Sequence, residues 1–186
     1  MRGGFPVARK EVTRMPVHVF TLVLDRRPDD PELDALLDAG CDDATFGVER
    51  GAPIAQFDRE APALADAIAS AVRGVESAGL RVFRVLDEDL LTLADIADRI
   101  GRSRESIRRY ATGERGGGGF PLPANPGREG TVFYRWSEVG PWLRGRLGID
   151  IPDTDPALVV ANLVLQARQH RDRVVHMSAL NDLLAA

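Results

Sequence analysis

The sequence predicts an α+β protein, because strand-like alternation and helical apolar spacing both occur along its 186 residues. Three observations support this class. Residues 16–88 alternate between the two patterns, residues 89–148 begin with two short helical segments around a glycine turn, and residues 149–186 are mostly helical.

The first strand and helix are marked by residue type and by their ends. Residues 17–24 are apolar and β-branched, which is typical of a strand. A helix is expected over residues 32–39, because Pro31 suits a first helical position and Gly40 suits a helix end.

A hairpin, a long helix and a final strand follow. Residues 44–49 and 53–58 flank residues 50–52 with the spacing of a β-hairpin. Residues 81–86 alternate strictly, as in a half-buried strand. Between them, a helix from about residue 61 to 77 is predicted by four apolar residues at helical spacing, which are Leu64, Ile68, Val72 and Val75.

The resulting order β-α-β-β-α-β is the signature of a ferredoxin-like domain, in which two helices pack on a four-stranded antiparallel sheet. This fold serves sensors, RNA-binding modules and dimerisation units alike, so it does not define a function. RNA binding is disfavoured, because residues 16–90 carry a net charge of −9. A protein partner or a small ligand at this domain stays open.

The next two helices form a predicted helix-turn-helix. The first begins where Thr92 and Asp95 can form a near capping box. Gly101 ends it, and Ser103 is placed to cap the second helix. The inward-facing residues are Leu93, Ile96, Ala97 and Ile100 in the first helix, and Ile107 with Tyr110 or Ala111 in the second.

The second helix, over about residues 103–111, presents arginine and hydroxyl side chains in its first two turns. In a helix-turn-helix this end enters the major groove, where arginine can bond guanine edges. The alternative is that these arginines form the ordinary solvated face of a packing module.

A wing and a third helix are expected next. The glycine run 116–119 cannot continue a helix, because ordering so many glycines costs too much entropy. Two segments with strand composition then flank a turn rich in glycine and proline. The strands are residues 120–123 and 131–136, and the turn is residues 125–130. Ser137 can cap the last helix, 138–143, with Pro141 in its first turn.

Over about residues 91–143 the sequence resembles the winged helix-turn-helix proteins of the MerR/AlpA-like excisionase group. The resemblance is carried by Ala97, Gly101, 103–110, 119–123, Gly127, Arg128, 135–139, Trp142 and Leu143. In that family the second helix reads bases, and the wing contacts phosphate or the minor groove. The resemblance thus implies DNA contacts by Arg104, Ser106, Arg108, Arg109, Arg128 and Arg135. We add Arg102, Ser103, Tyr110 and Arg115 as neighbouring DNA-binding positions.

The distribution of charge agrees with this division. The whole chain has a net charge of −4, whereas residues 91–148 carry +4. A basic module beside acidic ones is typical of a DNA-contacting domain joined to a regulatory or partner-binding domain. We therefore expect four parts: 1–15, a flexible basic tail; 16–88, a ferredoxin-like regulatory or interaction domain; 89–148, a winged helix-turn-helix; and 149–186, a linker with C-terminal helices.

The C-terminal helices are predicted over about residues 156–168 and 178–184. The first is apolar on most faces and must be covered. It either packs on the preceding parts or pairs with its twin in a homodimer, and a homodimer suits a palindromic DNA site.

Other chemistry finds little support in the sequence. Cys41 is the only cysteine and is expected to be a small, half-buried residue near a turn. Three widely spaced histidines provide no metal motif, and the glycine run lacks the Lys-Ser/Thr of a phosphate loop. We expect no enzyme activity, cofactor or metal.

No apolar run approaches the roughly 20 residues of a membrane span, so we expect a cytoplasmic protein without membrane contact. The arginine-rich composition, with a single lysine, indicates a bacterial genome.

The sequence therefore predicts a bacterial, sequence-specific DNA-binding protein, of transcriptional-regulator type, that binds double-stranded DNA as a homodimer. The alternative is an antitoxin-like or adaptor module whose acidic N-terminal domain binds a protein partner.

Overall fold

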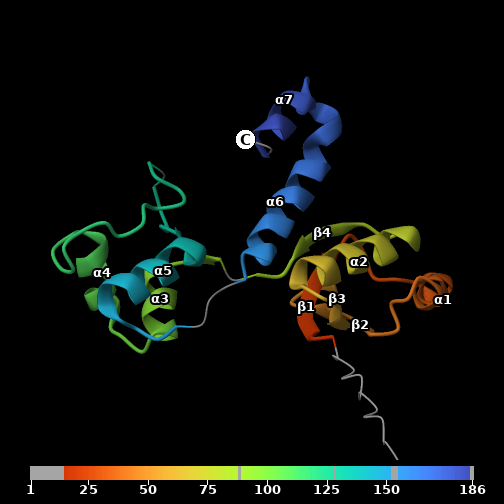
Figure 1. Cartoon of the computed structure of the whole chain (residues 1–186), viewed down its shortest axis with the longest axis horizontal. Helices are drawn as coiled ribbons and strands as arrows, with labels where there is room; N and C mark the ends of the chain where they lie inside the picture. Colours follow the sequence, from red (N-terminus) through yellow and green to blue (C-terminus); the bar gives the residue numbers. More distant parts are fainter. Residues whose placement is uncertain (1–14, 88, 128, 152–154, 185–186) are drawn as a thin grey trace, which may run out of the picture.

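The structure, a computed structural model, describes residues 15–87, 89–127, 129–151 and 155–184. The strands are β1 (Val17–Leu24), β2 (Ala44–Glu49), β3 (Ala52–Glu60), β4 (Val82–Val85), β5 (Leu90–Leu91) and β6 (Tyr134–Arg135). The α-helices are α1 (Asp30–Asp38), α2 (Leu64–Ser77), α3 (Leu93–Arg99), α4 (Arg104–Ala111), α5 (Trp136–Leu147), α6 (Pro156–His170) and α7 (Met177–Asn181). Figure 1 shows two bodies, one that contains β1 to β4 with α1, α2 and α6, and another that contains α3, α4 and α5.

Strands β1 to β4 form one antiparallel sheet in the order β2-β3-β1-β4. The predicted mixed α+β class and the β-α-β-β-α-β element order are confirmed. The hairpin between β2 and β3 is tighter than expected, because Glu49 pairs directly with Ala52. Arg50 and Gly51 both have positive φ, at 49° and 84°, as a two-residue hairpin turn requires.

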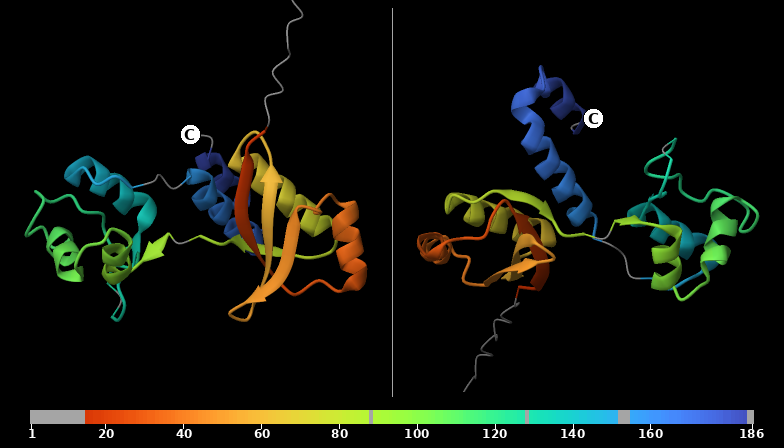
Figure 2. Two further views of the ribbon diagram at one scale, coloured as in Figure 1. Left: turned by 90° about the horizontal axis from the view of Figure 1, so that it is seen from below. Right: turned by 180° about the vertical axis from the view of Figure 1, so that it is seen from behind.

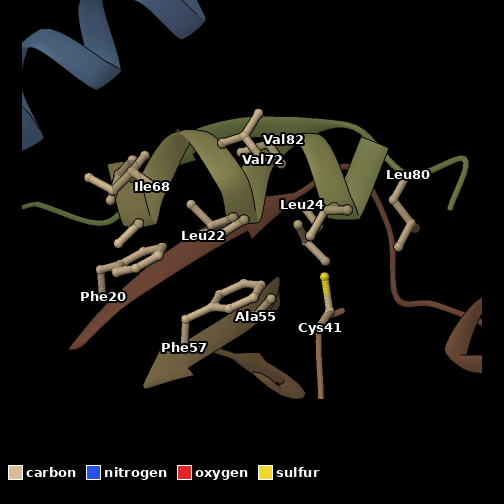
Figure 3. Close-up of a cluster of buried hydrophobic side chains, with 14 of the residues drawn as sticks. Phe20, Leu22, Leu24, Cys41, Ala55, Phe57, Ile68, Val72, Leu80 and Val82 are labelled. Atoms are coloured by element: carbon tan, nitrogen blue, oxygen red, sulfur yellow. The ribbon is translucent and has the colours of Figure 1, made fainter. Parts of the chain in front are cut away.

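The core of this body lies between the sheet and α2. Figure 3 shows side chains of β1 and β3 beneath Ile68 and Val72 of α2. Phe20 and Phe57 stack on neighbouring strands with ring centroids 5.4 Å apart. Helix α1 packs against α2 and contributes the fully buried Leu36.

A buried arginine joins the ends of several elements. Arg59 of β3 is 8% exposed, donates two hydrogen bonds of 2.7 Å to the Asp43 carboxylate and lies over the Phe57 ring. The Asp43 hydrogen bonds raise the pKa of Arg59.

Cys41 is buried rather than half-buried, and burial raises the pKa of its thiol.

Helix α6 packs against β4 and α2, and the two views of Figure 2 place it beside them. The Asn162 side chain accepts a hydrogen bond from the Val85 N–H and donates one to the Val85 carbonyl. Gln169 donates to the carbonyl of Phe83 on the same strand. The two side-chain amides satisfy backbone hydrogen-bonding groups on the outer side of β4, which is an edge strand of the sheet. Left unpaired, such groups can pair with a strand of another chain.

The second body is built from α3, α4 and α5. Its buried core includes Ile96, Ile107, Val139 and Leu143, each with 0% exposure. Its small two-stranded sheet pairs β5 with β6 and so differs from the predicted wing. Residues 120–123 form no strand, because Ala124 and Asn125 instead bond the backbone at residues 131 and 133.

Helix α5 also starts earlier than predicted. It begins at Trp136, so Ser137 lies inside its first turn and is not its N-cap residue. Pro141 consequently falls in the second turn, inside the helix. The prediction failed because the cap of α5 comes from a distant residue, Asp89, as described below.

The Asn162 contacts predict a measurable contribution to stability. Asn162→Ala leaves the Val85 N–H and carbonyl without their partner, and we expect it to lower the free energy of unfolding by about 1–3 kcal/mol. Gln166→Ala, an exposed position on the same helix, is the control and should change it by less than about 0.5 kcal/mol. Urea unfolding measures both, and equal effects would contradict the role given to Asn162.

Candidate nucleic-acid interface

The helix-turn-helix forms because each of its ends has a local signal. Thr92 and Asp95 make the expected capping box: the Asp95 N–H donates to Thr92 Oγ1 and the Thr92 N–H donates to Asp95 Oδ2. The hydrogen bond from the Thr92 hydroxyl lowers the pKa of Asp95. Gly101 turns the chain with φ of 63°, and the Ser103 hydroxyl accepts from the Ser106 N–H at the start of α4.

Asp89 fixes helix α5 against this pair of helices. It is 6% exposed, and its Oδ1 accepts a hydrogen bond of 2.7 Å from the Ser137 N–H. Its Oδ2 accepts from Arg135 at 3.2 Å, and its carbonyl accepts from the Trp136 N–H. A residue 48 positions upstream therefore caps the first turn of α5.

A glycine loop lies over the aromatic part of the same core. Gly116 to Gly119 all have positive φ, between 72° and 80°. A β-carbon at Gly116 would lie 2.9 Å from Tyr110 Cδ1 and 3.3 Å from Trp142 Cη2. The Tyr110 and Trp142 rings meet edge-on at 5.6 Å, so the loop closes over them only with glycine there.

Two of the predicted DNA-binding arginines are exposed and free. Arg102 lies in the turn and Arg104 at the first position of α4, and neither has an ion-pair or hydrogen-bond partner among the described residues. Ser103 and Ser106 lie beside them, with Ser103 engaged in its cap. The structure therefore places two exposed arginines at the turn and the N-terminal end of α4.

Arg108 is held by two carboxylates instead. Its guanidinium donates to Glu105 at 2.8 and 2.9 Å and to Glu114 at 3.0 and 3.3 Å. The hydrogen bonds with Glu105 and then Glu114 raise the pKa of Arg108, and those with Arg108 lower the pKa of both glutamates. Arg109 lies 3.6 Å from Glu114.

The remaining predicted positions are scattered. Tyr110 is 7% exposed and belongs to the core, so its ring lies inside the body. Arg115 lies over the Tyr110 ring at 5.5 Å, and Arg135 is engaged with Asp89. Arg128 lies outside the described residues.

One cation beside the glycine loop was not predicted. Arg146 is exposed, and its Nη2 would lie 3.8 Å from a β-carbon at Gly119. The Trp142 Nε1 atom is equally near and, among the described residues, is a buried side-chain donor without a hydrogen-bond partner. The sequence signal that could have found Arg146 is its spacing from Trp142, because residues four apart on a helix share a face.

No family model matches the chain, and the searches of curated proteins and of solved structures found no match. In the part of the chain that the structure describes, no group of histidine, cysteine, aspartate and glutamate side chains could hold a metal ion. None of the described helices is both long and apolar enough to cross a membrane.

The glycine loop gives a test with a matched control. Gly116→Ala and Gly117→Ala both place a side chain at positive φ, at a cost of about 1–2 kcal/mol, but only Gly116 has an atom within 4 Å. We expect Gly116→Ala to cost about 1–3 kcal/mol more, because its methyl overlaps Tyr110. Thermal unfolding followed by tryptophan fluorescence measures the difference, and equal losses would show that the loop does not close on Tyr110.

Proposed function

We propose that this chain is a bacterial, sequence-specific DNA-binding protein of transcriptional-regulator type, in which α4 enters the major groove. The observation that carries the proposal is a pair of exposed arginines, Arg102 and Arg104, at the turn and the N-terminal end of α4. Neither has an ion-pair or hydrogen-bond partner among the described residues. This is the end of a recognition helix that reaches base edges and adjacent phosphates.

The arrangement of the elements supports the same proposal. A short helix, a glycine turn and a second capped helix pack on α5, as in a helix-turn-helix. The glycine loop and residues 120–133 occupy the place of a wing in the chain. We assign them that role although the described residues of this range form no hairpin of two strands. The sheet order β2-β3-β1-β4 supports a ferredoxin-like arrangement of residues 16–88.

The charges assign different roles to the arginines. Arg102 and Arg104 can bind phosphate or guanine without first breaking an ion pair. Arg108 is neutralised by Glu105 and Glu114, so DNA contact by its guanidinium requires displacement of two carboxylates. We therefore assign Arg108 a positioning role on α4, and Arg102 and Arg104 the direct contacts. Arg109 also lies against Glu114, at 3.6 Å, and reaches DNA only after that ion pair is broken.

A second candidate function is binding of a protein partner by the N-terminal body. It rests on the net charge of −9 of residues 16–90, which would attract a basic surface. The two functions separate experimentally, because DNA binding weakens on removal of Arg102 and Arg104 whereas a contact made by the acidic body does not.

Arginine removal tests the main proposal. We expect Arg102→Ala and Arg104→Ala each to weaken binding to DNA fragments selected from a bacterial genome by about tenfold or more. Arg27→Ala, an exposed arginine of the first body, is the control and should leave affinity unchanged. Fluorescence anisotropy at several salt concentrations measures the effect. Equal affinities for all three variants would remove the basis of the proposed interface.

Arg108, which is paired with two carboxylates, gives a prediction in the opposite direction: a substitution that tightens DNA binding. Replacing Glu105 and Glu114 together by glutamine frees the Arg108 guanidinium and removes two negative charges from the surface. We expect tighter DNA binding and a steeper salt dependence, with the slope of log K against log salt increasing in magnitude by about 0.9 for each added phosphate contact. The same titration measures it, and unchanged binding would place Arg108 away from the DNA.

A further inference from the structure

The C-terminal helices carry an exposed apolar surface that nothing in the described chain covers. Of the 19 large hydrophobic side chains that are exposed among the described residues, seven lie between residues 160 and 183. They are Val160, Leu163, Val164, Val174, Val175, Leu180 and Leu183, and Val175 and Leu183 are 82% and 72% exposed. Such a concentration in a short segment marks a contact surface more than ordinary scatter of apolar residues.

Part of this surface is hollowed into a groove between α2 and α6. Its cavity volume is about 410 Å³. Ile68, Ala69 and Val72 line it from α2, and Val160, Ala161 and Val164 line it from α6. The walls are thus nearly all apolar, which suits the apolar face of a helix.

Three charged residues line the groove toward the C-terminal end of α2. Arg168 of α6 and Glu76 of α2 form an ion pair of 2.6 Å. Arg73 also lines the groove but has no partner among the described residues. An occupant of this groove should therefore combine apolar side chains with one negative charge.

The chain itself contains such a segment, at α7 and the turn that follows it. Met177, Leu180 and Leu183 recur at three-residue spacing, and Leu180 and Leu183 are exposed. Asp182 lies among them and has no partner in the described part of the chain. Figure 1 shows α7 at the far end of α6, away from the sheet.

We propose that residues 177–184 of a second copy occupy the α2–α6 groove, with Asp182 against Arg73, so that two copies exchange these segments in a homodimer. The exposed Leu180 and Leu183 match the apolar walls of the groove, and Asp182 matches the charge of Arg73. A two-fold axis makes the two contacts identical.

Reversal of the two charges tests this arrangement by mixing. Arg73→Asp and Asp182→Arg each create two like-charge contacts per dimer, and each variant alone should raise the dimer dissociation constant about tenfold or more. An equimolar mixture restores two opposite-charge contacts in every heterodimer, so dimers should reappear. Light scattering measures this as recovery of twice the monomer mass of 20.3 kDa. Arg27→Asp is the charge-matched control and should dimerise like the wild type.

The other outcomes contradict the proposal in distinct ways. A monomeric wild type rules out the dimer at once. Dimers insensitive to either reversal place the interface elsewhere. A stability loss in each single variant that the double variant repairs, without rescue on mixing, means that α7 occupies the groove of its own chain. None of these results depends on DNA, so failure here leaves the proposed DNA binding to its own test.

Discussion

Asp89 accepts hydrogen bonds from the Ser137 N–H and from Arg135, and its carbonyl accepts from the Trp136 N–H. These contacts set the N-terminal end of α5, and α5 supplies Val139 and Leu143 to the core on which α3 and α4 rest. A buried carboxylate without such partners would be costly, so the position of Asp89 and the position of α5 depend on one another. Because α4 shares this core with α5, the exposed end of α4 is oriented with respect to that third helix.

Two features of the charge distribution bear on the proposed function: the net charge of each body, and the ion pairs on α4. The +4 of residues 91–148 and the −9 of residues 16–90 favour approach of a polyanion to the second body and disfavour its approach to the first. Within the second body, ion pairs with Glu105 and Glu114 reduce the number of free cations on α4. Specificity in the proposed function would then depend on a few unpaired arginines more than on total charge.

The local parts of the fold could be predicted from the sequence, because their causes lie within a few residues. The capping box of Thr92 and Asp95 and the helix end at Gly101 are of this kind. The pairing of β5 with β6 and the cap from Asp89 could not, since their partners lie more than 40 residues apart. The Asn162 contacts with β4 join residues 77 apart, and nothing in either segment specifies the other.

The candidate site, too, could be predicted only where the cause lies within a few residues of the sequence. Helical spacing correctly placed Arg104 on the surface, because exposure follows from the period of the helix. It could not show that Arg108 is neutralised, since Glu114 lies beyond the end of α4 and reaches it only through the turn after the helix. The apolar character of residues 156–168 predicted that the helix needed cover, and the structure locates part of that cover at α2 and β4.

The most direct test of the account is amide hydrogen exchange of the full chain, with and without DNA fragments that it selects from a bacterial genome. The account predicts slower exchange on DNA binding in residues 101–109, and unchanged exchange in β1 to β4. Protection confined to the first body, or no protection anywhere at saturating DNA, would contradict a DNA interface at the turn and the N-terminal end of α4.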